Sequence, residues 1–297
     1  MKSIIMELPL GDRMKSYEKD SEKVYSKKDN IVVRIDGHKF SEFTSEFKKP
    51  FDDVFGISMI NATKDLVERF ECSLGYTQSD EITLIIPSID VMDRSTRKSL
   101  SKKEKYNDLK LENWTHILGG REQKLVSLIS SAITIRFNFH LEKELLKVKG
   151  EEDYVKKITK KLWTAEFDVR IFPVPNKEEL LNSILWRCRD AEKNSVSNTA
   201  IKSISHKSLL LKNSDERIEM LKELGIDWNK TPGMYKYGTT IKREIFSMNM
   251  EDIKGVPEKY RTDTKVYRTR MKELYMKWSF SDENLKLITN RFVEEEI

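Results

Sequence analysis

Two aspartates lie where predicted strands end, and their position suits the binding of divalent cations. Asp36 follows the β-branched run 31–35 and precedes Gly37, while Asp80 lies beside Glu81 at the tip of an expected hairpin. If these strands are neighbours, both carboxylates lie at the same end of one sheet. Carboxylate oxygens suit Mg²⁺, and two such ions can activate an attacking hydroxyl and stabilise the leaving oxygen of an in-line phosphoryl displacement. The alternative is that each aspartate belongs to an ordinary turn, and neither residue alone decides between the two.

The elements that must position these carboxylates follow from the spacing of apolar residues. The predicted elements are, in order, a strand at 31–35, a helix within 51–70, hairpin strands at 74–78 and 82–86, a helix from Arg121, a strand at 167–174, and a helix that begins with the capping pair Asn176 and Glu179. This order, β-α-β-β-α-β-α, predicts an α+β fold in which helices cover one face of an antiparallel sheet.

The chain divides by composition into a core and an extension. We expect a catalytic domain over residues 1–205 and a lysine-rich, mostly helical extension over 206–297, in which only a segment near 234–245 looks extended. The basic segment 90–111 lacks an apolar period and is interpreted as an exposed insertion. No internal repeat or heptad array is found.

Composition bounds the class of protein. Hydrophobic residues make up 38% of the 297, enough for a buried core, and the net charge of +5 permits a polyanionic partner without requiring one. The two cysteines form no CxxC pair, which argues against a structural zinc site and a disulfide framework. The sequence shows neither a signal peptide nor an apolar run of membrane-spanning length. We therefore expect a cytoplasmic protein without a membrane partner, and leave an organellar location open.

Six short motifs surround the two aspartates and continue beyond them. They are Val33-Arg34-Ile35-Asp36-Gly37-His38-Lys39-Phe40, then Lys49-Pro50, then Tyr76-Thr77-Gln78-Ser79-Asp80-Glu81, then Phe167-Asp168-Val169-Arg170, then Trp186-Arg187 with Asp190 and Asn194, and then Pro232 with Met234-Tyr235-Lys236-Tyr237-Gly238-Thr239. In this order, across residues 30–245, they resemble the motifs of the tRNA-histidine guanylyltransferase family.

This resemblance implies a palm-like sheet, with a β-α-β-β-α-β core similar to that of template-directed polymerases, and a site that binds two Mg²⁺ ions. It implies that Asp36 and Asp80 are the catalytic metal ligands, assisted by the Gly37 carbonyl. A nucleoside triphosphate would bind the backbone of the turn formed by Gly37, His38, Lys39 and Phe40, because successive amides make an anion-binding concavity.

The same resemblance implies further phosphate contacts. Ser79 would add a hydroxyl, and Lys49, Arg121 and Lys124 match basic positions that meet phosphates. Arg121 and Lys124 are expected in the first turn of a helix, an end that favours anions. For each basic residue the alternative is a solvated surface charge.

A polar row follows in the predicted helix after Asn176. Arg187, Asp190, Asn194 and Asn198 are spaced by three, four and four residues, so one helix face carries them all. Such a face can be merely solvated. The resemblance favours contacts with RNA or nucleotides.

One block departs from the eukaryotic enzymes dedicated to histidine tRNA. Those carry His-Ile-Asn-Asn-Leu-Tyr-Asn-Thr, whereas this chain reads Glu192-Lys193-Asn194-Ser195-Val196-Ser197-Asn198-Thr199. The absence of the histidine favours the guanylyltransferase-like branch, which repairs truncated tRNA 5′ ends by templated 3′-to-5′ addition. A dedicated guanylyltransferase that adds one 5′ guanylate is the alternative.

The resemblance also implies substrates and an assembly. ATP or GTP would activate the 5′ end of the RNA, GTP or another nucleoside triphosphate would be added to it, and the protein would form a homotetramer. Two other hypotheses are a palm-type nucleotide cyclase and a non-catalytic RNA-binding module. The match at 234–239 argues against the cyclase, and retention of Asp36, Asp80 and Glu81 argues against the module.

Overall fold

The computed structural model describes residues 9–89, 115–253, 255, 257–260 and 265–294. The basic segment 90–111, interpreted above as an exposed insertion, lies outside these residues. Within the described part of the chain, no helix is long and apolar enough to cross a membrane.

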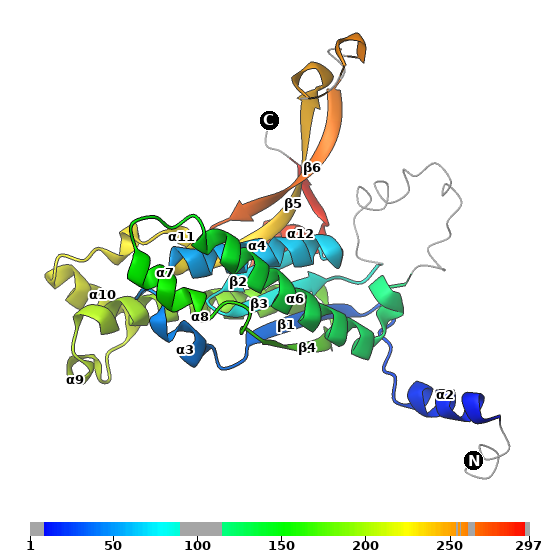
Figure 1. Cartoon of the computed structure of the whole chain (residues 1–297), viewed down its shortest axis with the longest axis horizontal. Helices are drawn as coiled ribbons and strands as arrows, with labels where there is room; N and C mark the ends of the chain where they lie inside the picture. Colours follow the sequence, from blue (N-terminus) through cyan, green and yellow to red (C-terminus); the bar gives the residue numbers. More distant parts are fainter. Residues whose placement is uncertain (1–8, 90–114, 254, 256, 261–264, 295–297) are drawn as a thin grey trace.

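One sheet organises the molecule (Figure 1). Its strand order is β4-β1-β3-β2-β5-β6, and β7 pairs with β5 in parallel while the other pairings are antiparallel. The strands are β1 (Asn30–Gly37), β2 (Leu74–Gln78), β3 (Glu81–Ile86), β4 (Phe167–Val174), β5 (Thr239–Asn249), β6 (Lys265–Leu274) and β7 (Phe292–Glu294). The predicted α+β fold with an antiparallel sheet is confirmed.

Helices pack on both faces of this sheet, whereas the sequence led us to expect them on one. The helices are α2 (Leu10–Asp20), α3 (Phe40–Phe43), α4 (Asp53–Arg69), α6 (Glu122–Leu145), α7 (Glu152–Thr159), α8 (Lys177–Ser203), α9 (His206–Leu209), α10 (Ser214–Glu223), α11 (Gly233–Lys236) and α12 (Asp282–Thr289). Helices α4 and α6 cover the face that carries Ile31, Val33 and Ile35, while α8 and α12 pack against Val32 and the opposite face. Residues 30–33 of β1 are buried without alternation, which is the pattern of a strand covered on both faces.

Local signals set the start of two long helices. The Asp52 carboxylate accepts a hydrogen bond from the Phe55 amide at the start of α4, over 3.0 Å. The Asn176 side chain accepts from the Glu179 amide at the start of α8, over 2.9 Å, which confirms the predicted helix start. Both caps satisfy amides that have no partner within their helix.

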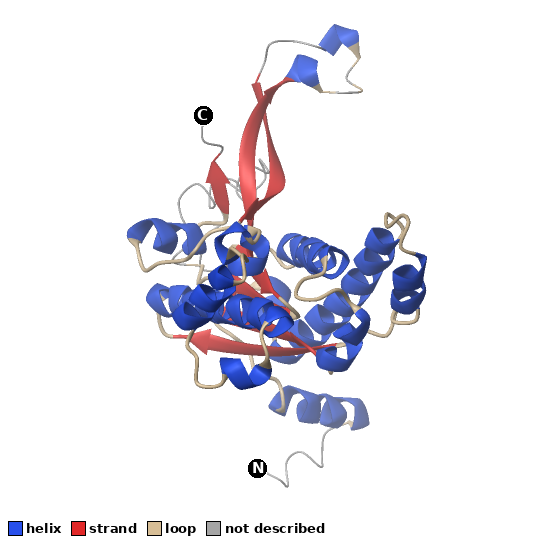
Figure 2. Ribbon diagram, turned by 90° about the vertical axis from the view of Figure 1, so that its left-hand side faces the viewer, coloured by secondary structure: helices blue, strands red, loops and turns tan. Residues whose placement is uncertain are grey.

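The C-terminal residues extend the same sheet. Strand β5 pairs with β2, and the β5–β6 hairpin continues away from the helices, as both views show (Figures 1 and 2). The expected extended segment near 234–245 is present from residue 239, after the short helix α11, but the strands β6 and β7 were not expected. The division of the chain at residue 205 stays a prediction.

Candidate active site

The structure brings Asp36 and Asp80 to the same end of the sheet. Asp36 lies opposite Glu81 in the β1–β3 register, and the Gly37 amide donates to the Asp80 carbonyl over 3.2 Å. Burial is the largest cause that raises the pKa of Asp80, and the nearby charge of Asp36 raises it further. A hydrogen bond from Ser79 and the charge of Arg187 act in the opposite direction. Two carboxylates that repel each other at one edge are a suitable place for a cation.

The turn after β1 is fixed by its glycine. A Cβ atom on Gly37 would lie 2.3 Å from the Phe40 ring, which packs against Phe167 with ring centroids 4.9 Å apart. The His38 amide donates to the Glu166 carbonyl over 2.9 Å, and the Gly37 amide is also used within the backbone. The anion-binding role predicted for this turn therefore rests on the amides of Lys39 and Phe40. The Phe40 side chain itself is buried and structural.

A pocket opens beside this end of the sheet and includes three of the predicted residues. Lys49, Ser79 and Asn198 line a cavity of about 130 Å³. Its wall also contains Phe51 and Tyr235, whose rings are stacked with centroids 4.5 Å apart and planes 10° apart. These two aromatic residues were not assigned a role from the sequence, although Tyr235 belongs to the last motif.

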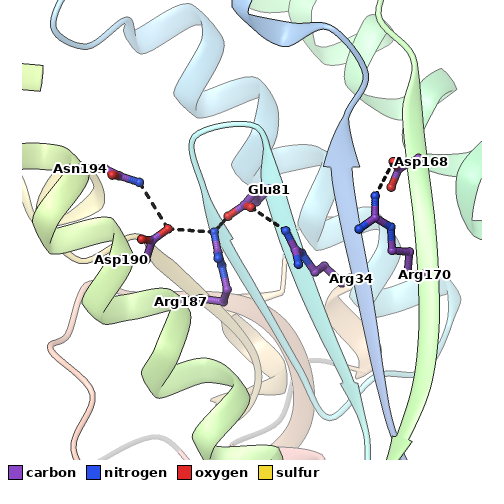
Figure 3. Close-up of polar contacts among 7 residues, drawn as sticks. All are labelled: Arg34, Glu81, Asp168, Arg170, Arg187, Asp190 and Asn194. Atoms are coloured by element: carbon purple, nitrogen blue, oxygen red, sulfur yellow. Dashed lines mark hydrogen bonds and ion pairs between the residues drawn. The ribbon is translucent and has the colours of Figure 1, made fainter.

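Ion pairs connect the hairpin turn to α8 (Figure 3). Glu81 pairs with Arg34 on β1 over 3.3 Å and with Arg187 on α8, and Arg187 also pairs with Asp190 over 3.2 Å. The side-chain amide of Asn194 donates a hydrogen bond to the Asp190 carboxylate over 3.4 Å. Arg187, Asp190 and Asn194 therefore lie on one face of α8, as predicted, and contact one another in sequence. Arg187 is buried, and its guanidinium group pairs with the carboxylates of Glu81 and Asp190. The contact of this face with RNA or nucleotide stays a prediction.

Two acidic residues near the site had no predicted role. Glu81 links Arg34 to Arg187, and its position beside Asp80 was the signal available in the sequence. Asp168 lies opposite Asp36 in the β1–β4 register and pairs with Arg170 over 3.2 Å. Only strand pairing, which local patterns do not reveal, places Asp168 there.

Arg121 and Lys124 do not line the pocket beside Asp80. Arg121 precedes α6 and pairs with Glu22 over 3.3 Å, and Lys124 lies in the first turn of that helix, as expected. This end of α6 contacts the segment before β1, where the Tyr25 amide donates to Gly120. The pocket lining contains neither residue. Their phosphate-binding role stays a prediction.

The oxygen donors at this site fit Mg²⁺. Among the described residues, no group of three or more His, Cys, Asp or Glu side chains could hold a metal ion. The carboxylates of Asp36 and Asp80 with the Gly37 carbonyl supply a small set of hard oxygen donors. Mg²⁺ is commonly held by one or two carboxylates, waters and substrate phosphates, so a larger protein cluster is not needed.

The fold and the paired carboxylates define a palm-like nucleotidyl-transfer protein, and sequence comparison identifies its family. Residues 11–175 match the family described as tRNAHis guanylyltransferase. The chain belongs to the tRNAHis guanylyltransferase family, whose enzymes are nucleotidyltransferases.

Relatives agree with this assignment. The tRNA(His) guanylyltransferase of Candida glabrata is 31% identical over 75% of this chain and 86% of its own length. An uncharacterized protein of Acanthamoeba polyphaga mimivirus is 32% identical over 98% of this chain and 93% of its own length. The chain is thus similar along nearly its whole length to a relative of undescribed function.

Solved structures share the fold. A bacterial tRNA(His) guanylyltransferase-like protein in complex with ATP has a TM-score of 0.61 and 30% identity, covering 79% of this chain and 87% of its own. Another such structure, in complex with GTP, has a TM-score of 0.60 and 25% identity, covering 90% and 91%. The fold is therefore shared with proteins that bind these nucleotides.

Proposed function

We propose that this protein adds nucleotides in the 3′-to-5′ direction to the 5′ end of tRNA and thereby repairs truncated 5′ ends. The observation that carries the proposal is that Asp36 and Asp80 lie at one end of the sheet, where Ser79, the residue before Asp80, lines a pocket together with Lys49. A triphosphate that binds both Lys49 and the Ser79 hydroxyl would extend toward Asp80, which follows Ser79 in the turn. Positioning and charge neutralisation supply most of the rate of phosphoryl transfer.

The pocket supports binding of a nucleoside triphosphate. The stacked rings of Phe51 and Tyr235 provide an apolar surface for a base, while Lys49 provides a cation and Ser79 a hydroxyl for phosphate. Similar bacterial proteins bind ATP and GTP. We assign the pocket to an incoming or activating nucleotide.

Asp36, Asp80 and the Gly37 carbonyl would hold two Mg²⁺ ions. When bound, such ions lower the pKa of the attacking hydroxyl and stabilise charge on the leaving group. The protein's own contribution is to position the reactants. Lys49 and the amides of Lys39 and Phe40 orient the triphosphate, and the ion pair between Glu81 and Arg187 holds the turn that carries Asp80.

The reaction has two phosphoryl transfers. The 5′-monophosphate of the RNA first attacks the α-phosphorus of ATP or GTP, which releases pyrophosphate and leaves a 5′-nucleotidylated end. The 3′-hydroxyl of the incoming nucleotide then attacks the RNA's own 5′ phosphorus, which releases AMP or GMP. A 5′-triphosphorylated end can enter the second transfer directly and release pyrophosphate.

The block at 192–199 supports the repair branch. It lies on α8, where Asn198 reaches the pocket and the Ser195 hydroxyl accepts from the Trp228 indole over 3.1 Å. The block thus lines the nucleotide pocket without the histidine of the dedicated enzymes. Contacts to phosphates and metal ions do not distinguish bases, so we infer that the incoming nucleotide is selected by pairing with a template base.

Product length tests the proposal. A 5′-truncated tRNA and a full-length histidine tRNA are each incubated with ATP, all four nucleoside triphosphates and Mg²⁺, and the products are resolved by length. We expect several nucleotides on the truncated tRNA and little extension of the full-length one. A single guanylate on the histidine tRNA, with the truncated tRNA unchanged, would assign the dedicated activity instead.

Two further properties belong to this proposal. By family resemblance we expect a homotetramer, which light scattering of the purified chain measures as four times the 35.0 kDa subunit mass. Because its substrates are tRNA and ATP, we expect the protein to act inside the cell.

A further inference from the structure

An exposed aromatic hollow lies on α8 beside the network of ion pairs. Trp186 and Phe280 line it, and their side chains are 54% and 57% exposed. Arg189 and Lys193 line the same hollow. Exposed aromatic side chains that line one hollow together with cations are typical of a binding site rather than of a solvated face.

The Trp186 ring is held by groups that are themselves fixed. The guanidinium carbons of Arg34 and Arg187 lie 5.5 and 4.8 Å from the centroid of the indole ring. Both guanidinium groups also pair with Glu81. The ring is therefore preorganised, and a ligand that stacks on its open part loses little conformational entropy on binding.

The rim of the hollow is positive. Arg189 and Lys193 are exposed, and within the part of the chain that the structure describes neither forms an ion pair. Asp190 also lines the hollow, but its carboxylate pairs with Arg187. An aromatic surface flanked by two available cations matches the base and the phosphates of a single nucleotide.

Two links connect the hollow to the carboxylates. Trp186 precedes Arg187, which pairs with Glu81 beside Asp80. The Arg34 guanidinium group lies over the Trp186 ring. Arg34 is two residues before Asp36 on the same face of β1, about 7 Å along the strand. A nucleotide in the hollow would therefore be close to the RNA end that reacts.

We propose that the hollow formed by Trp186, Phe280, Arg189 and Lys193 binds an unpaired nucleotide of the RNA's 3′ tail, an inference that rests on the proposed function. The reacting 5′ end must lie at Asp36 and Asp80. The strand opposite that end leaves the duplex at the same place, so unpaired bases near the site belong to the 3′ strand. Sequence-independent recognition of unpaired bases uses aromatic stacking together with backbone phosphate contacts.

Binding to two RNA hairpins tests this inference without any need for catalysis. Both are labelled acceptor-stem mimics, one with a four-nucleotide 3′ tail and one blunt, and their affinity is measured by fluorescence anisotropy. Base stacking contributes about 1–3 kcal/mol, so Trp186→Ala should weaken binding of the tailed RNA by about 5-fold to 150-fold. Binding of the blunt RNA should change less than about twofold, because that RNA presents no base to the hollow.

Matched variants separate stacking from structure. Trp186→Phe keeps an aromatic face and should retain most of the tail-dependent affinity, while Phe280→Ala should lose part of it. Trp163→Ala is the control, because Trp163 is 56% exposed and lies outside the hollow, and it should bind both RNAs like wild type. Circular dichroism and thermal unfolding confirm that each variant is folded.

The outcomes distinguish this inference from the proposed function. Equal weakening for both RNAs in the Trp186 and Phe280 variants, or no weakening in either, overturns it. Loss of tail preference in Trp186→Ala and partial loss in Phe280→Ala, with Trp186→Phe and Trp163→Ala close to wild type, supports it. If wild-type protein adds no nucleotide to any RNA but shows tail-dependent binding through Trp186, the proposed function fails and the hollow remains an RNA site.

Discussion

Glu81 on β3 and Arg187 on α8 form an ion pair across the sheet end that carries Asp80. The Arg187 side chain is 8% exposed and the Glu81 side chain 18%, so the pair is largely removed from water. Arg34 supplies Glu81 with a second, longer contact. The position of the Asp80 turn is therefore coupled to a helix that lies far away in the sequence.

Replacing Arg187 should destabilise the fold as well as reduce activity. Arg187→Met leaves the Glu81 carboxylate with Arg34 alone, and loss of one partner of a buried pair costs about 3–5 kcal/mol. We expect a loss of unfolding free energy near the lower end, because Arg34 remains. Urea unfolding measures this change in the free energy of unfolding. Asp190→Asn removes the more exposed partner of Arg187 and should cost less than about 1 kcal/mol. Similar losses in both variants would contradict this order.

Asp36→Ala and Asp80→Ala should each abolish nucleotide addition while the protein stays folded. Each substitution removes one of the two carboxylates proposed to hold the metal ions and phosphates, so we expect a decrease in rate of at least about a hundredfold. Single-turnover extension of a 5′-triphosphorylated RNA measures the second transfer alone. Circular dichroism shows whether the fold is retained. Substantial extension by either folded variant would refute the two-metal assignment.

Local patterns in the sequence were sufficient for the central sheet. β1 and the β2–β3 hairpin are short strand-like runs that end in polar turns. Their neighbouring placement was only a condition for Asp36 and Asp80 to share ions, and the strand pairing of the structure supplies it. Strand β6 was missed because its pattern is not apolar on one side. Its residues pair with β5 in a hairpin whose outer part is covered by no helix among the described residues, so polar side chains are tolerated on both faces.

Contacts between distant segments could not be read from the sequence. The cavity joins Lys49 before α4 to Asn198 on α8, and Phe51 to Tyr235 in α11. Each partner has an ordinary local pattern, and only the packing of α4 and α8 at the same end of the sheet brings them together. Trp186 is a further example, because Phe280, which is distant from it in the sequence, lines the same hollow.

The two lysines predicted to meet phosphates are expected to differ. Lys49 lines the pocket and Lys124 does not, so Lys49→Ala should raise the KM for the nucleoside triphosphate by about tenfold, the equivalent of one charge-assisted hydrogen bond. Lys124→Ala should change this KM less than Lys49→Ala does, because Lys124 does not line the pocket. An equal increase would show that the start of α6 contacts the triphosphate, as the family resemblance implies. Steady-state kinetics with each triphosphate measure both variants. An unchanged KM in Lys49→Ala would exclude the pocket as the triphosphate site.

Stability should decrease in mild acid through His116. This residue is buried, its Nε2 lies 3.0 Å from the Asp29 carbonyl, and burial lowers its pKa from the usual 6.5. The folded state therefore disfavours the protonated ring. The contribution of His116 is complete above about pH 6.5 and is lost as the pH falls through 6.5 toward the lowered pKa. Thermal unfolding between pH 8 and 5.5 should show a steeper decline in wild type than in His116→Gln.

The choice of nucleotide should follow the opposing base of the RNA. The proposed contacts at Asp36, Asp80 and Lys49 are to metal ions and phosphates, which are the same in every nucleoside triphosphate and cannot distinguish bases. The block 192–199 lacks the histidine of the dedicated enzymes, so pairing with the template supplies the specificity. In truncated tRNAs that differ only in the base opposite the first missing nucleotide, each added nucleotide should be the complement, as sequencing of the products would show. An enzyme built for histidine tRNA would add guanylate to all four. That result would replace the repair activity proposed here with dedicated guanylate addition, and the nucleotide pocket would then have to select guanine by direct contacts.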